Sequence, residues 1–115
     1  MTISLKRAYE PAAKTDGLRV LVDRLWPRGI KKTDASIDLW RKELAPSTEL
    51  RKWFGHDPEK WCEFQDRYRT ELKGNEGLAE IRALSREGKV TLIYGAKDEE
   101  HNQALVLKEV LEHDA

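Results

Sequence analysis

The sequence predicts a small α/β domain in which about five helices pack against an at least partly parallel, three-stranded sheet. Three short apolar segments, at residues 3–9, 18–22 and 90–94, have the residue pattern of β-strands. Apolar residues at helical spacing fill the stretch between the second and third segments and follow the third, an order typical of α/β folds. A chain of 115 residues suits one domain, and no repeat or low-complexity linker divides it. We therefore expect a single domain over residues 1–115.

The first two strands are expected near the N-terminus. The first alternates apolar Ile3 and Leu5 with polar neighbours, as a half-buried strand does. The second, Leu-Arg-Val-Leu-Val at residues 18–22, is an apolar and β-branched run typical of a central strand buried on both faces. Pro27 and Gly29 then indicate a loop, because proline cannot donate a ladder hydrogen bond and glycine permits a sharp turn. The direction of the first strand relative to the second is left open.

Four helices are expected in the middle of the chain. Their apolar faces are Ile37, Trp40 and Leu44; Leu50, Trp53 and Phe54; Trp61, Phe64, Tyr68 and Leu72; and Leu78, Ile81 and Leu84. Residues that cap or break helices mark their ends. Pro46 ends the first, Ser47 and Gly55 bound the second, Asp57 caps the third, and Gly88 ends the fourth.

The third strand, Val-Thr-Leu-Ile-Tyr at residues 90–94, is followed by a turn and a last helix that we expect to begin near Asp98. A right-handed crossover between the second and third strands would make them parallel. Ligands of open α/β sheets bind beyond the carboxyl ends of the strands, where loops converge. The sequence therefore predicts a ligand-binding crevice after these two strands.

Composition restricts the chemistry of such a crevice. Lys plus Arg and Asp plus Glu both number 21, so the formal net charge is zero, whereas general nucleic-acid binders carry a basic excess. This balance disfavours nucleic acid as a partner without excluding it. Cys62 is the single cysteine, and no spacing typical of a zinc site occurs, so no metal is assigned. No apolar run approaches the ~20 residues that span a bilayer, and no signal peptide is recognisable, which predicts a cytoplasmic protein without membrane contact. No cofactor or oligomeric state is assigned.

Polar and aromatic side chains follow each predicted strand. The candidate ligand-binding residues are Arg7 and Tyr9 after the first strand, Arg24, Trp26 and Arg28 after the second, and Lys97, Asp98 and Asn102 after the third. His101 and Asp23 are the candidate catalytic residues, because an imidazole and a carboxylate can together move a proton. Guanidinium groups suit carboxylate or phosphate oxygens, and a helix that began near Asp98 would add free N–H groups and keep His101 neutral in its first turn. We expect a small anionic ligand.

A structural role is open for several of the same residues. Asp98 is also explained by capping the last helix, and Asp23 and Arg24 are also explained by internal ion pairs that fix the loop. Trp26 is explained by packing beside Pro27. These interpretations stand beside the functional one.

Nearly the whole chain resembles the YeaO-like bacterial proteins, a branch of the domain of unknown function 488 superfamily. The matching motifs are Leu-Val-Asp-Arg-Leu-Trp-Pro-Arg-Gly at 21–29, Asp-Leu-Trp at 38–40, Ala-Pro-Ser-Thr at 45–48, Arg-Lys-Trp-Phe-Gly-His at 51–56, Tyr-Arg at 68–69, Thr-Leu-Ile-Tyr at 91–94 and Ala-Lys-Asp-Glu-Glu-His-Asn-Gln-Ala at 96–104. The resemblance implies a compact α/β fold and carries no established activity. Many members of the wider family have a cysteine- and histidine-containing motif after the last strand, and the corresponding segment here has no cysteine.

Three functions remain open at the level of sequence. The leading one is an uncharacterised small protein that binds a small anion in the crevice, with or without catalysis. The alternative is a regulatory module that binds nucleic acid or protein without catalysis, through a basic and aromatic surface at Arg28, Lys31, Lys32, Arg51, Lys52 and Trp53. The third is a loop that only locks the fold or a dimer.

Overall fold

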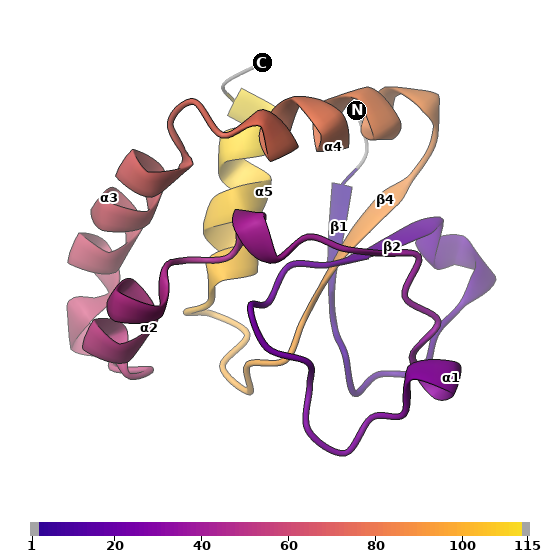
Figure 1. Ribbon diagram of the computed structural model, residues 1–115, viewed down its shortest axis with the longest axis horizontal. Coiled ribbons are helices and arrows are strands. Elements are labelled where there is room, and N and C mark those ends of the chain that lie inside the picture. Colours follow the sequence, from indigo (N-terminus) through magenta and orange to yellow (C-terminus); the bar gives the residue numbers. More distant parts are fainter. Residues whose placement is uncertain (1–2, 114–115) are drawn as a thin grey trace.

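A computed structural model describes residues 3–113, whose four strands form one parallel sheet (Figure 1). The strands are β1 (Ile3–Arg7), β2 (Leu18–Leu21), β3 (Leu39–Trp40) and β4 (Val90–Tyr94). Their order across the sheet is β1-β4-β2-β3, and each neighbouring pair is parallel. The α/β class and the parallel relation of the two central strands are confirmed. The first strand, whose direction was open, runs parallel to β4, and the sheet has one strand more than expected.

The additional strand, β3, lies in a segment where Ile37, Trp40 and Leu44 predicted a helix. That prediction is wrong: β3 pairs with the end of β2, and a single 3-10 turn follows it. The Asp38 carboxylate accepts the backbone N–H of Arg19 at 2.8 Å, and the Asp38 N–H donates to the Arg19 carbonyl at 2.9 Å. These bonds tie the segment to the edge of β2. The spacing of side chains within a short apolar stretch cannot predict hydrogen bonds to a strand that is distant in the sequence.

Five α-helices surround the sheet in the described residues: α1 (Lys32–Ala35), α2 (Thr48–Phe54), α3 (Trp61–Leu72), α4 (Glu76–Glu87) and α5 (Gln103–His113). The bounds of α2 are those its local sequence dictates, since Ser47 accepts the N–H of Leu50 and Gly55 ends the helix with a φ of 53°. A 3-10 turn over Pro58–Lys60 precedes α3, which therefore starts later than the Asp57 cap predicted. Within residues 3–113, none of the helices has the length and apolar character needed to cross a membrane.

Both faces of the sheet are covered. Val20, Val22 and Leu92 pack into the main core with side chains from α2 to α5. Leu21 and Ile93 alternate to the opposite face and are also fully buried. In Figure 1, α2, α3 and α5 stand on one side of the strands, and the connection that carries α1 lies on the other. This two-sided burial explains why the central strands are almost continuously apolar.

The loop from β4 to α5 differs from its prediction. The helix begins at Gln103, and Asn102 is its N-cap, because the Asn102 side chain accepts the N–H of Leu105 at 3.1 Å. Asp98 instead caps the preceding turn, where its Oδ1 accepts two backbone N–H groups at 2.9 and 3.1 Å. The expectation that His101 lies in the first turn of this helix is therefore wrong. Because His101 precedes α5, the expectation that the dipole of this helix keeps its imidazole neutral has no structural basis.

Candidate functional site

A cavity of about 360 Å³ lies beyond the carboxyl ends of β2 and β4. Its walls come from five parts of the chain: the loop after β1, the loop after β2, the segment from residue 45 to residue 56 that includes α2, the start of α3, and the loop after β4 with the first residue of α5. Two neighbouring parallel strands end here, which is the usual place of ligands in open α/β sheets. The cavity thus lies where the sequence predicted a crevice, and its occupation by a ligand stays a prediction.

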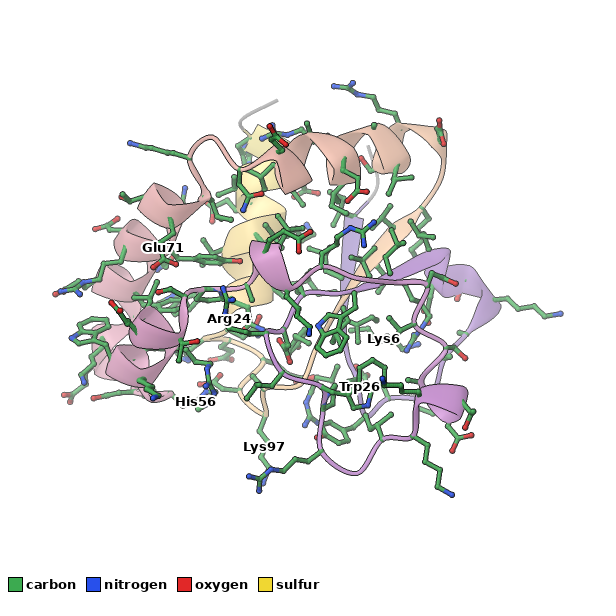
Figure 2. The ribbon with its side chains drawn as sticks, viewed as in Figure 1. Lys6, Arg24, Trp26, His56, Glu71 and Lys97 are labelled. Atoms are coloured by element: carbon green, nitrogen blue, oxygen red, sulfur yellow. The ribbon has the colours of Figure 1, made fainter. Side chains whose placement is uncertain are left out.

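Six of the predicted site residues line this cavity: Tyr9, Asp23, Arg24, Trp26, Arg28 and His101. Arg24 and His101 border the same space because β2 and β4 are parallel neighbours, so the loops after them meet. In Figure 2, Arg24 and His56 lie toward α2, whereas Trp26 lies nearer α1.

The four remaining predicted residues lie outside the cavity wall. Arg7 donates from Nε to the Ala96 carbonyl at 2.9 Å and so holds the loop after β4 against the end of β1. Asp98 and Asn102 form the turn and the helix cap described above. Lys97 is exposed and extends outward from this loop (Figure 2). The structure thus gives Arg7, Asp98 and Asn102 bonds that shape the loop.

Asp23 is a largely buried carboxylate in the cavity wall. Its Oδ2 accepts the backbone N–H of Gly95 at 2.8 Å, and its Oδ1 accepts the side-chain amide of Gln103. A Cβ at Gly95 would lie 3.0 Å from Oδ2, so glycine allows this close approach. Burial raises the pKa of Asp23 to about 6, while the Gly95 hydrogen bond and the positive charge of Arg51 oppose that rise. The alternative that internal ion pairs of Asp23 and Arg24 fix the loop is not what the described residues show, because Asp23 accepts from neutral donors and Arg24 donates to backbone carbonyls.

Three arginines line the cavity, in two different situations. Arg24 donates from Nε to the carbonyl of Pro46 at 3.1 Å and from Nη2 to that of Ala45 at 3.4 Å. Arg28 and Arg51 are exposed, and within residues 3–113 their guanidinium groups make no hydrogen bond or ion pair. Arg24 therefore supports the wall, while the other two can turn toward an incoming anion.

His101 is fixed by its neighbours. Its Nδ1 lies 2.9 Å from Asp98 Oδ2, and its ring packs edge-on against Trp61 with 5.4 Å between the ring centroids. With a proton on Nδ1 for this bond, Nε2 is left as the acceptor. The pKa of Asp98 is lowered, first by the N–H of Glu100 and then by His101. The carboxylate bonded to His101 is thus that of Asp98, whereas Asp23 was predicted as its catalytic partner.

Trp26 and Tyr9 border the cavity but are engaged elsewhere. Trp26 donates from Nε1 to the Ile30 carbonyl at 2.7 Å, and its ring packs edge-on against Trp40. Tyr9 donates its hydroxyl to the Arg28 carbonyl at 3.0 Å. The first bond closes the loop after β2 on itself, and the second ties this loop to the segment after β1.

Sequence reasoning missed several cavity residues, above all Arg51, His56 and Gln103. Arg51 was placed on an alternative basic surface, because the face that α2 turns toward the sheet depends on tertiary packing. His56 has a φ of 57°, which is uncommon for a residue other than glycine and occurs often at functional sites. The motif at residues 51–56, which carried part of the family resemblance, was the available signal for both.

The described residues contain no group of three or more histidine, cysteine, aspartate or glutamate side chains placed to hold a metal ion. The chemistry of the cavity therefore rests on guanidinium, imidazole, carboxylate and aromatic groups.

Comparison with known proteins gives a consistent picture. Residues 2–115 match the model of the family DUF488-N3i, described as the inactive DUF488-N3 subclade. The chain is 47% identical over 112 residues to the uncharacterized protein YeaO of Escherichia coli (strain K12), which covers 96% of this chain and 97% of that protein. It is 42% identical over 109 residues to the uncharacterized protein Mb3100c of Mycobacterium bovis, with 95% and 92% covered. No solved structure matches.

Proposed function

We propose a function for this chain from the family to which it belongs, DUF488-N3i, the inactive DUF488-N3 subclade. The chain binds a small anion in the cavity beyond β2 and β4 and does not convert it. The membership agrees with the YeaO-like resemblance expected from the motifs. The word "inactive" in the description of the family supports binding over catalysis. A cytoplasmic location stays a prediction.

The observation that carries the proposal is the charge of the cavity wall. Arg24, Arg28 and Arg51 line it, and Asp23 is the one carboxylate among the lining residues that the structure describes. The chain as a whole has a formal net charge of zero, so this positive charge is local. Guanidinium groups pair with oxyanions through two parallel N–H donors, and such charge-assisted bonds are about twice as strong as neutral ones.

Thermal unfolding and calorimetry with phosphate, sulfate and small carboxylates test this proposal. A ligand that binds only the folded state stabilises it by about 2.7 kcal/mol at 100 times its Kd. The variant Arg28→Gln/Arg51→Gln should lose the response to anions, because it removes two guanidinium groups without breaking a bond in the described structure. Arg86→Gln, on the exposed last turn of α4, is the matched control and should respond like the parent protein.

Two results would contradict anion binding in this cavity. One is a parent protein that no anion of the panel stabilises. The other is a double variant that responds as fully as the Arg86→Gln control.

Catalysis is the second candidate, and one observation favours it. His101, held by Asp98 at 2.9 Å and bordering the cavity, has the arrangement of a general base with its orienting carboxylate. If the protein is an enzyme, His101→Gln should abolish turnover of the bound anion and leave its Kd within about twofold. A ligand recovered unchanged after prolonged incubation with the parent protein would support binding alone.

The nucleic-acid module receives less support. Trp53 is an aromatic residue at a basic surface, yet Lys60 Nζ lies 5.2 Å and the Arg67 guanidinium 4.4 Å from the centre of its ring. These cations already contact the ring on which a base would stack. Salt-sensitive retention of single-stranded DNA or RNA at low ionic strength, lost in Trp53→Ala, would favour this module over the anion site.

A further inference from the structure

We propose that the ligand of this cavity is a mononucleotide, whose phosphate meets the arginines and whose base presents N–H donors to Asp23. This inference rests on the proposed anion site and names the class of ligand. It follows from the size of the cavity, its mixed lining and the bonding of its carboxylate.

The cavity is larger than a simple anion requires. Its volume of about 360 Å³ corresponds to roughly ten water molecules at ~30 Å³ each, several times the size of phosphate or sulfate. The ring of Phe54 stacks on that of Phe64, with centroids 4.3 Å apart, and both residues line the cavity. Pro27 and Pro46 add further apolar surface. A ligand that fills this space therefore combines an anionic group with an apolar, ring-sized part.

Asp23 indicates what that second part carries. In a cavity that binds only an anion, a carboxylate would repel the ligand. Asp23 nevertheless stays unpaired with any arginine within residues 3–113, and its described side-chain bonds come from the Gly95 N–H and the Gln103 amide. A carboxylate can accept about four hydrogen bonds, so each oxygen keeps capacity for one more donor. The ligand is therefore expected to offer N–H groups in addition to its anion.

Two adjacent N–H donors match the two oxygens of a carboxylate. A guanine presents such a pair, N1–H beside its amino group, whereas an adenine presents an acceptor beside its amino group. Hypoxanthine presents N1–H alone. Asp23 is therefore expected to favour guanine over hypoxanthine, and hypoxanthine over adenine. The burial that raises the pKa of this carboxyl makes its charge disfavoured without a ligand, which agrees with a recognition role.

The experiment measures Kd by calorimetry for inorganic phosphate, ribose 5-phosphate, GMP, IMP and AMP. We expect GMP to bind at least ten times more tightly than ribose 5-phosphate, IMP between the two, and AMP no better than ribose 5-phosphate. In Asp23→Asn, the advantage of GMP over ribose 5-phosphate should fall to within twofold, while inorganic phosphate still binds. Asp66→Asn, at an exposed position of α3, is the matched control and should keep the advantage.

Each other outcome overturns the inference in an identifiable way. If phosphate, ribose 5-phosphate and GMP bind with equal affinity, the anion site stands and the nucleotide is rejected. If AMP binds as tightly as GMP, or Asp23→Asn keeps the GMP advantage, Asp23 does not recognise the base. If Asp23→Asn loses phosphate as well, Asp23 only supports the wall. If none of the five compounds binds, the nucleotide is rejected, and the anion site fails as well when sulfate and the small carboxylates also leave the protein unstabilised.

Discussion

At the scale of single residues, Asp23 occupies a position that disfavours its own charge. Burial raises its pKa from 3.8 to about 6, so the folded state holds this proton more tightly than the unfolded chain does. The stability that Asp23 contributes is therefore fully present below pH ~4 and is lost as the pH rises through ~6. A shift of this size corresponds to a loss on the order of 3 kcal/mol above pH 7.

Replacement of Asp23 by asparagine should therefore stabilise the protein at high pH. The amide has the same shape, carries no charge and can still accept the N–H of Gly95. We expect Asp23→Asn to raise the free energy of unfolding by about 2–3 kcal/mol at pH 8 and by almost nothing at pH 4. Urea denaturation at the two pH values measures this. An equal effect at both, or a loss of stability at pH 8, would contradict the raised pKa.

Local sequence located part of the site and missed part of it. Asp23, Arg24 and Arg28 follow a recognisable strand directly, so their placement at its carboxyl end required only the rule for parallel sheets. Arg51 lies on α2 and His56 follows it, and both line the same cavity because α2 packs against α3. The orientation of a helix relative to a sheet edge is set by contacts between residues far apart in the sequence.

At the scale of elements, a buried ion network joins the strands on the side of the sheet opposite the main core. Asp16 Oδ2 accepts Arg19 Nη1 at 2.5 Å, and Lys6 Nζ lies 3.1 Å from Asp16 Oδ1. Arg19 also donates to the carbonyls of Ala35 and Ser36 at the end of α1. The network thus links β1, β2 and α1. Hydrogen bonding, first by the N–H of Ala13, lowers the pKa of Asp16 to about 2.

Loss of this network should destabilise the fold strongly. Asp16→Ala leaves the Arg19 guanidinium buried without its partner, and removing one member of a buried pair costs about 3–5 kcal/mol. Glu80→Ala removes an exposed partner of Arg41 and should cost less than about 1 kcal/mol. Guanidinium denaturation compares the two variants. Similar losses in both would show that Arg19 relaxes to a new partner.

The difference between local bonds and bonds to distant residues explains which elements could be predicted from the sequence. Ser47 caps the start of α2 and Gly55 caps its end, so local sequence is sufficient to predict the bounds of this helix. β3 exists because Asp38 bonds to Arg19 across the sheet, and the start of α5 depends on Asn102 reaching back to the Asp98 carbonyl at 3.0 Å. Neither bond is visible in side-chain spacing.

At the scale of the whole molecule, the carboxyls with raised and with lowered pKa values act on stability in opposite senses. Asp16, with its lowered pKa, contributes stability that is present above pH ~4 and is lost as the pH falls toward ~2. The pKa values of Asp98, Glu80 and Glu109 are also lowered by their hydrogen bonds, so they act in the same sense. Asp23 acts in the other sense, because its contribution is lost as the pH rises through ~6. Together these groups confine the most stable state to mildly acidic conditions.

The free energy of unfolding should therefore pass through a maximum near pH ~4 and decline from there to pH ~6, which denaturant titrations from pH 3 to pH 9 would measure. The limb above the maximum is expected to flatten in Asp23→Asn, because the raised pKa of Asp23 produces it. The acidic limb should remain in that variant, because Asp16 and its partners are unchanged. A saturating anion should raise the whole curve, since it binds the folded state alone. A maximum at pH 7 or above in the parent protein would mean that Asp23 is solvated and that burial does not disfavour its charge in the wall of the cavity.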